Sequence, residues 1–264
     1  NINRPAKNNI GLFGYIQGAR IENIALGGFH SFITGENSVG VLVGNARSNN
    51  QIRNTSIGAN VQGDDYVGGL VGQANAGTHI ENSFVSGSVR GEQYVGGLVG
   101  KLGGSSISQS LSTSSVSGNR DAGGLIGDVY DADVISSYWS KNTSGQDYSA
   151  GSSEASSYVG LNLTVLQCAT AENTDSTTGC VSADGSDEGL SAAVILYKDW
   201  DPAVWDFGID PNVSEQLPGL KLNGQVIRDN DADGIFDEDD SFPNNRAASQ
   251  DLDTDGYPDA WLLT

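Results

Sequence analysis

Short apolar segments recur along the first half of the chain at a nearly constant interval, and each is too short to form a stable helix. The hexapeptide Val-Gly-Gly-Leu-Val-Gly occupies residues 67–72 and recurs unchanged at 95–100, with variants at 39–44, 122–127 and 9–14. Its closing glycines lie 30, 28, 28 and 27 residues apart and are Gly14, Gly44, Gly72, Gly100 and Gly127. A period of this length indicates a repeat architecture.

Each period holds two further apolar segments, bounded by Gly, Asn or Ser turn residues. One begins at Ile21, Ile52, Ile80, Ile107 and Ile135, and the other at Ile33, Val61, Val89 and Val116. Three short strands per period describe one coil of a parallel β-solenoid, in which each strand pairs with its equivalent in the neighbouring coils. We therefore expect an all-β fold built on a short parallel β-solenoid (β-helix) of about five coils, roughly 24 Å tall.

The repeat alignment predicts which side chains stack from coil to coil. An internal aliphatic ladder would contain Leu12, Leu42, Leu70, Leu98 and Leu125, and a polar ladder would contain Asn23, Asn54, Asn82, Gln109 and Ser136. The glycines would lie at corners that need positive φ, or where backbone packs closely on backbone. An open solenoid end is a template for another strand. We expect residues 139–227 to cap the C-terminal end, whereas residues 1–7 offer little cover for the other.

The hexapeptide at this period resembles the GLUG motif of bacterial surface proteins, adhesins and some large secreted peptidases. Five copies cover residues 9 to about 139, and the segments 137–151 and 205–220 resemble those that close the repeats in that family. The resemblance implies a β-solenoid at the cell surface. It specifies an architecture and no activity.

From Arg228 onward, acidic residues alternate with other residues at the spacing of a twelve-residue calcium loop. Positions 1, 3, 5, 7, 9 and 12 of such a loop supply oxygen ligands, and a glycine at position 6 permits the sharp bend. The ligand positions hold Asp229, Asp231, Asp233, Ile235 through its carbonyl, Asp237 and Asp240. Gly234 stands at position 6. The pattern predicts Ca²⁺ as the cofactor.

A second copy of this loop follows 22 residues later. Its ligand positions hold Asp251, Asp253, Asp255, Tyr257 through its carbonyl, and Asp259, whereas Leu262 stands where the last ligand would be. The tail resembles the calcium repeats of thrombospondin type 3 and related bacterial linkers, because Pro-containing segments follow the loops where an EF-hand needs helices. The alternative is a solvated acidic tail.

Charge divides the chain into two halves. Residues 1–128 carry eight acidic and eight basic side chains, while residues 129–264 carry 25 acids and five Lys or Arg, so the net charge of −20 belongs to the second half. Such a field repels nucleic acid and anionic membrane and attracts divalent cations. The negative charge therefore predicts no nucleic-acid partner. The chain also has no apolar run of membrane-spanning length, so we predict no membrane insertion.

Cys168 and Cys180 are the only cysteines, and they lie close together in a Ser/Thr-rich stretch. They predict one local disulfide and therefore an oxidising, extracellular setting, either secreted or attached to the cell surface. Two free thiols are the alternative. Residues 1–9 lack signal-peptide character, which suggests a processed protein or a fragment of a longer one.

A catalytic function was weighed because parallel β-helices often carry polysaccharide lyases and hydrolases. Candidate carboxylates on the solenoid are Asp64, Asp65, Glu81, Glu92, Asp121, Asp128, Asp131 and Asp133. Several of them fall at the same turn of successive repeats, where solvated loop tips are expected. His30 and His79 have no acid or cysteine at ligand spacing. We therefore predict that the chain is not an enzyme.

We expect three regions: a GLUG-repeat solenoid over 1–139, a disulfide-pinned capping region over 140–227 and a calcium-binding tail over 228–264. The predicted function is that of an extracellular structural or adhesive protein, stiffened by calcium and stacking head to tail into a surface filament. One alternative is a non-assembling segment of a larger adhesin that binds surface glycans, and another is a polysaccharide-active β-helix enzyme or its accessory module. Sequons at Asn54, Asn142, Asn162 and Asn212 leave glycosylation open.

Overall fold

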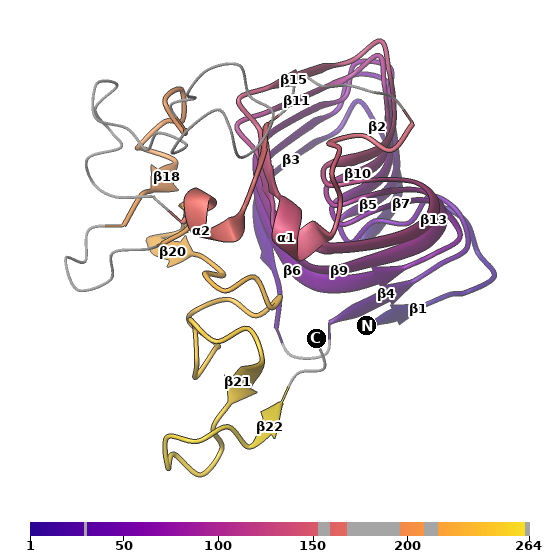
Figure 1. The fold of residues 1–264 in the computed structure, drawn as a ribbon. Helices are drawn as coiled ribbons and strands as arrows, with labels where there is room; N and C mark the ends of the chain where they lie inside the picture. Colours follow the sequence, from indigo (N-terminus) through magenta and orange to yellow (C-terminus); the bar gives the residue numbers. More distant parts are fainter. Residues whose placement is uncertain (29–30, 153–158, 168–195, 209–215, 262–264) are drawn as a thin grey trace.

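The chain folds as a stack of parallel coils, with the C-terminal part lying along one flank of the stack (Figure 1). The computed structural model describes residues 1–28, 31–152, 159–167, 196–208 and 216–261. The fold is all-β and is a parallel β-solenoid of about five turns, as the repeat pattern predicts. Cys168 and Cys180 lie outside the described residues, so their disulfide stays a prediction.

One wall of the solenoid is a five-stranded parallel sheet to which every coil contributes one strand. In spatial order its strands are β14 (Ile126–Tyr130), β10 (Val99–Gly103), β8 (Val71–Asn75), β5 (Val43–Arg47) and β2 (Phe13–Gln17). Val43 pairs with Val71, Val71 with Val99, and Val99 with Ile126. The strand register therefore follows the sequence period.

A twelve-stranded sheet forms the remaining walls. Its longest strands, β6 (Gln51–Gln62) and β9 (His79–Gly96), pair in parallel along eleven residue pairs. The other strands are β1 (Ile2–Asn3), β3 (Arg20–Leu26), β4 (Phe32–Thr34), β7 (Asp65–Gly68), β11 (Ser106–Ser108), β12 (Leu111–Ser112), β13 (Ser115–Gly123), β15 (Asp133–Ile135), β16 (Tyr138–Ser140) and β17 (Val159–Leu161).

The predicted aliphatic ladder forms in four of the five coils. Leu42, Leu70, Leu98 and Leu125 are fully buried in the solenoid core. The prediction for Leu12 is wrong, because its side chain is 51% exposed. Strand β2, which follows it, has β5 as its neighbour on one side and lies at the edge of the sheet. Leu125 lies in the last coil, where residues 149–150 cover it, so a ladder position is buried only where chain packs on both sides.

The predicted polar ladder is hydrogen-bonded through its first three members, and its positions have a backbone role that spacing alone does not reveal. Asn54 donates from Nδ2 to Oδ1 of Asn23 at 3.0 Å, and Asn82 donates to Asn54 at 3.3 Å. All five ladder positions have positive φ: Asn23 58°, Asn54 50°, Asn82 49°, Gln109 42° and Ser136 44°. Asparagine tolerates this left-handed conformation better than most residues. The ladder therefore marks a corner of each coil.

The repeat glycines satisfy the second of the two expectations, close backbone packing. A Cβ built on Gly72 would lie 2.5 Å from the carbonyl oxygen of Gly44, and one on Gly100 would lie 2.6 Å from that of Gly72. Positive φ occurs instead just before the hexapeptides, at Ser38, Tyr66, Tyr94 and Asp121. The glycines therefore permit close approach between coils, and polar or aromatic residues turn the chain.

The C-terminal end of the solenoid is closed by the segment that follows the last coil. Strand β17 pairs with β16, and the indole of Trp139 lies where a Cβ on Gly124 or Gly160 would clash. Helix α1 (Lys141–Ser144) follows β16, and α2 (Leu163–Leu166) follows β17. This part of the predicted capping region covers the end.

The described residues 196–208 and 216–227 of the predicted capping region pack on the flank of the solenoid, which corrects the expectation that they cover the end. Trp205 donates from its indole to Oδ1 of Asn82 at 3.1 Å, and Trp200 donates to the carbonyl oxygen of Ser136 at 2.8 Å. Both indoles belong to a second apolar core that includes Phe84 and Leu111 of the solenoid. Aromatic residues here cover outward-facing apolar residues of successive coils.

The described C-terminal residues form two small antiparallel sheets, the first of which contributes to this second core. Strands β18 (Trp205–Asp206), β19 (Gly219–Leu222) and β20 (Gln225–Ile227) make one, and β21 (Ala248–Gln250) and β22 (Ala260–Trp261) make the other. The aspartate-rich loops follow β20 and β21. No helix among the described residues is long and apolar enough to cross a membrane.

Candidate metal centre

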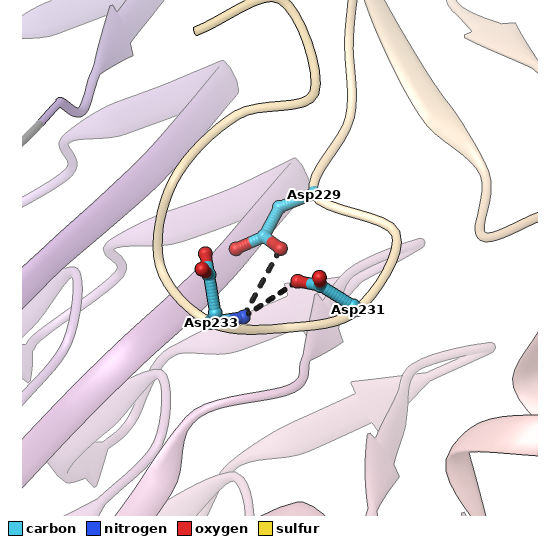
Figure 2. A group of neighbouring side chains, drawn as sticks. All are labelled: Asp229, Asp231 and Asp233. Carbon is cyan, nitrogen blue, oxygen red and sulfur yellow. Dashed lines mark hydrogen bonds between the residues drawn. The ribbon is translucent and has the colours of Figure 1, made fainter. Parts of the chain in front are cut away.

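The first aspartate loop follows β20 and curls around its own carboxylates (Figure 2). The curl has positive φ at Gly234, 96°, where the calcium-loop pattern requires a glycine, and also at Ala232, 63°. The backbone N–H of Asp233 donates to Oδ1 of both Asp229 and Asp231, at 3.2 Å each. Figure 2 shows the three carboxylates converging on the inside of the curl.

Further backbone donors fix the orientation of each carboxylate. Gly234 donates to Oδ2 of Asp229 at 2.8 Å, and Ile235 donates to Oδ1 of Asp233 at 2.7 Å. The carboxylate of Asp237 accepts from the backbone of Asn230 at 2.7 Å, which closes the loop. Both oxygens of Asp229 and Oδ1 of Asp231, Asp233 and Asp237 thus accept from the backbone.

Three other carboxylate oxygens of the loop are buried without any hydrogen-bond partner. They are the Oδ2 atoms of Asp231, Asp233 and Asp240. Ligand oxygens of Asp229, Asp231 and Asp233 lie within 4.8 Å of one another, which suits a single metal ion. An unpaired carboxylate oxygen is costly to bury, and a hard cation with oxygen ligands would satisfy several at once.

Burial raises the pKa of each aspartate at the predicted ligand positions of this loop. The pKa of Asp229, whose side chain is fully buried, rises well above its ordinary value, and neighbouring Asp231 and Asp233 add repulsion. Loss of solvent raises the pKa of Asp231 to about 6, that of Asp233 to about 7 and that of Asp237 to about 6. Burial also raises the pKa of Asp240. A bound cation would offset this accumulated negative charge.

The first loop is buried because it is seated on the solenoid wall. A Cβ on Gly58 would lie 2.6 Å from the carbonyl oxygen of Gly234, and one on Gly27 would strike the ring of Phe236. Gly234 in turn lies against Gly87. Small residues on the outer face of successive coils therefore make room for the loop and for the ring of Phe236.

Hydrogen bonds outside the loop hold its start in place. Arg228 forms an ion pair with Asp206 at 2.8 Å and donates from Nε to the carbonyl oxygen of Leu217 at 2.6 Å. Asn230 accepts from the backbone of Leu217 at 2.8 Å and donates to Asn244 at 2.7 Å. The loop is thus connected to the flank core on one side and to the chain that follows it on the other.

The second loop repeats the hydrogen bonds of the first but is mostly exposed. Asp255 donates from its backbone to Oδ1 of Asp251 and Asp253 at 3.2 Å, and Gly256 donates to Oδ2 of Asp251 at 3.0 Å. The backbone of Leu252 donates to Asp259. Thr254 and Gly256 have positive φ, 59° and 84°, at the positions of Ala232 and Gly234.

The structure brings together part of each predicted ligand set. Asp229, Asp231 and Asp233 form one cluster, and Asp251, Asp253 and Asp259 form the other. Asp240 is buried and close enough to Asp231 to raise its pKa, which agrees with a place at the last ligand position. One oxygen of Asp255 accepts a hydrogen bond from the backbone of Tyr257 at 2.9 Å. The Ile235 and Tyr257 carbonyls remain predicted ligands.

Sequence reasoning did not find the residues that position the first loop. Gly27, Gly58 and Gly87 belong to the solenoid, and Phe236 occupies a non-ligand position of the loop. A glycine on the outer face of a coil looks like any turn residue, so no local signal marks it as a contact for a distant loop. A lone aromatic residue inside an acidic segment, as at 236, was the signal available.

The fold defined by these walls and corners is that of a parallel β-solenoid protein. Residues 63–90, which span one coil, match the GLUG motif. The thrombospondin type 3 resemblance of the tail stays a prediction, since the match ends well before it. Searches of curated proteins and of solved structures gave no match.

Proposed function

We propose that this chain is an extracellular structural and adhesive module in which a calcium ion, held by the first aspartate loop, braces the flank of the solenoid. The observation that carries this proposal is the set of buried, unpartnered oxygens on Asp231, Asp233 and Asp240. They lie in a loop whose spacing is that of a calcium site and whose backbone already has the curled conformation. Oxygen-rich sites of this kind suit Ca²⁺.

Each part of the loop has a physical role in this proposal. Asp229, Asp231, Asp233 and Asp240 would supply carboxylate oxygens, and the ion would neutralise the repulsion among them. With the loop closed, Phe236 stays between the flank and the coils. Extracellular modules bind calcium at about 10⁻⁴–10⁻³ M, which is the concentration range outside cells. The solenoid would then present its outer faces as a rigid surface.

The proposal is tested by thermal unfolding of the whole chain with 2 mM calcium (~13 times a dissociation constant of about 0.15 mM) and again with excess chelator. Calcium should raise the melting temperature by about 4 °C. Asp229→Asn should remove most of this increase, because it takes a charge from a buried ligand. Asp251→Asn, the same change at the equivalent position of the exposed loop, should leave the increase in place. Equal melting temperatures with and without calcium would contradict the proposal.

Head-to-tail stacking of chains is the second part of the proposal, and the N-terminal edge favours it. Strand β1 covers β4, but β2 and β3 each have a partner strand on one side among the described residues. Leu12 and Tyr15, 51% and 53% exposed, lie at this edge. At the other end, β15 pairs with β11 alone and exposes Ile135. In the repeat register, Asp133 of one copy would lie next to Arg20 of the next.

Sedimentation of the chain at several concentrations, with calcium present, tests the stacking. We expect assemblies longer than a dimer, and we expect Leu12→Lys to return them to monomers because it places a charge on the apolar edge. Lys substitution at exposed Val226, on the flank, is the matched control. A monomer at every concentration would contradict stacking and favour the non-assembling adhesin segment.

A further inference from the structure

A groove of about 400 Å³ runs between the solenoid and the first aspartate loop. Its floor is the outer face of β6 and β9, where Asn60 and Ser88 stand side by side in neighbouring coils. Its opposite wall contains Asp233 and Arg246 from the C-terminal region. Pockets of 300–1,000 Å³ are the usual size for small-molecule ligands.

Two arginines give this groove a charge opposite to that of the chain as a whole. Arg90 and Arg246 both line it, in a protein of net charge −20. Within the part of the chain that the structure describes, neither guanidinium lies within ion-pair distance of a carboxylate, although the charge of Arg246 acts on nearby Asp233 and partly offsets the rise in the pKa of that carboxyl. Arg90 donates from Nε to the hydroxyl of Ser88 at 3.2 Å, which directs it along the groove floor. The groove is therefore prepared for an anionic group.

The remaining lining residues suit a sugar ring. Asn60 and Ser88 offer an amide and a hydroxyl, which can both donate and accept hydrogen bonds to sugar hydroxyls. Phe32 lies next to Asn60 in the adjacent coil and is 39% exposed, so one face of its ring is open at the end of the groove. An aromatic face, a few amide and hydroxyl groups and a positive pole together match an acidic monosaccharide unit.

We propose that this groove binds a uronic-acid residue of a polysaccharide, with the sugar carboxylate on Arg90 and Arg246 and the ring against Phe32. Arginine is the preferred partner of a carboxylate because its planar guanidinium donates two parallel hydrogen bonds. The site lies on an exposed flank of the coils, where a polymer chain can enter and leave.

Calcium at the first loop would control this site, a step that rests on the proposed function. Asp233 is both a wall of the groove and a predicted calcium ligand. Its free carboxylate would repel an incoming uronate, whereas a carboxylate that coordinates calcium would not. Loop closure also sets the distance between Arg246 and the solenoid. We expect uronate binding to weaken when calcium is removed.

The test measures the binding of two sugars to the full chain by saturation-transfer NMR. The sugars are methyl β-D-glucuronide and methyl β-D-glucoside, and the carboxylate of the first is their only difference. In calcium, the glucuronide should bind about tenfold more tightly, the size expected for one charge-assisted pair. Arg90→Gln and Arg246→Gln should each remove this preference. Arg120→Gln, the same change at an exposed arginine one coil away, should keep it.

The outcomes separate the groove from the calcium brace. Three results would overturn the proposed uronate site and leave the calcium brace intact, provided that melting still depends on calcium. These are equal binding of the two sugars, unchanged binding in both arginine variants, and inorganic sulfate that competes as well as the glucuronide does. If glucuronide binding depends on the two arginines but the melting temperature is the same with and without calcium, the uronate site is supported and the calcium brace is overturned. If neither sugar binds and calcium does not change the melting temperature, both proposals are wrong.

Discussion

The two aspartate loops have the same conformation and very different surroundings. In each, the backbone N–H of the residue at position 5 donates to the aspartates at positions 1 and 3, and that of the residue at position 6 donates to the aspartate at position 1, with distances that agree within 0.2 Å. Asp229 is fully buried, whereas Asp253, Asp255 and Asp259 of the second loop are exposed. The spacing of aspartates therefore sets the shape of the loop, and the solenoid wall sets its electrostatics.

This difference explains why the first loop is a candidate brace of the fold and the second is not. In the first loop the unpaired oxygens are shielded from water, so the metal-free state is under electrostatic stress. In the second, water can solvate the carboxylates when no ion is bound. Coupling between calcium and the rest of the fold should be confined to the first loop.

The largest expected effect comes from removing the apolar anchor of the first loop. Phe236 is 3% exposed and packs against Gly27 and Gly58, so Phe236→Ala should lower the free energy of unfolding by about 3–5 kcal/mol. Tyr257→Ala, an aromatic truncation in the second loop at a side chain that is 75% exposed, should change it by less than about 0.5 kcal/mol. Urea unfolding in calcium measures both. Equal losses would contradict the different roles assigned to the loops.

A smaller effect is expected when the change is made in the solenoid wall beneath the first loop, the seat formed by Gly27, Gly58 and Gly87, and not in the loop itself. Gly58→Ala places a Cβ 2.6 Å from the carbonyl oxygen of Gly234, and the loop must shift, at a cost of about 1–3 kcal/mol. Part of that cost should appear as weaker calcium binding at the first loop, measured by calorimetric titration. The control is Gly91→Ala, which crowds Val67 and Val95 inside the solenoid but touches no part of the loop. If both variants bind calcium equally, the seat is not coupled to the site.

The solenoid could be predicted from the sequence because its interactions repeat. Each coil pairs with a copy of itself, so the period of the hexapeptide alone sets the register, as the pairing of Val71 with Val43 and Val99 shows. Leu12 was mispredicted because burial depends on neighbours on both sides, and the edge coil has one. The repeat therefore predicts how strands pair between coils, but it does not predict the burial of side chains in the first and last coils.

The ligands of the candidate metal site could be predicted from the sequence, but the contacts of the loop with the solenoid could not. Aspartate spacing is a local property, so Asp229 and Asp251 could be aligned at once. The contacts of Gly234 in the first loop with Gly58 and Gly87 join residues 176 and 147 positions apart that share no pattern. The same limit hid the flank packing of residues 196–208 and 216–227, because an aromatic cluster indicates burial without indicating the surface it covers.

A modest effect is expected from pH in the absence of calcium. The pKa values of Asp231 and Asp233, about 6 and about 7, lie above those of the unfolded chain, so the folded state holds more protons between pH 4 and 7. The contribution of these groups to stability is therefore greatest at low pH and is lost as the pH rises through 6 to 7. In chelator, the melting temperature should drop by about 5 °C across this window, relative to a chain carrying Asp231→Asn and Asp233→Asn.

The exposed loop supplies the control for that pH dependence. A chain with Asp251→Asn and Asp253→Asn loses the same two charges, and it should follow the wild type across the window. Calcium at saturating concentration should flatten the wild-type profile, because an ion that requires the carboxylates deprotonated replaces the protons. A wild-type profile that matches the Asp231 and Asp233 variant in chelator would show that burial does not stress the first loop.

The smallest effect on stability should come from completing the second loop. Leu262 stands at its last ligand position, where the first loop has Asp240, so Leu262→Glu adds the carboxylate that calcium loops use there. Calcium affinity of the second loop should rise about tenfold, whereas the melting temperature should change by less than about 1 °C, because this loop is exposed. Thr264→Glu adds the same charge two residues away and should leave the affinity unchanged. A large rise in melting temperature with Leu262→Glu would mean that an exposed aspartate loop can brace the fold without a solenoid seat, and the distinction between the two loops would then rest on ligand number and not on burial.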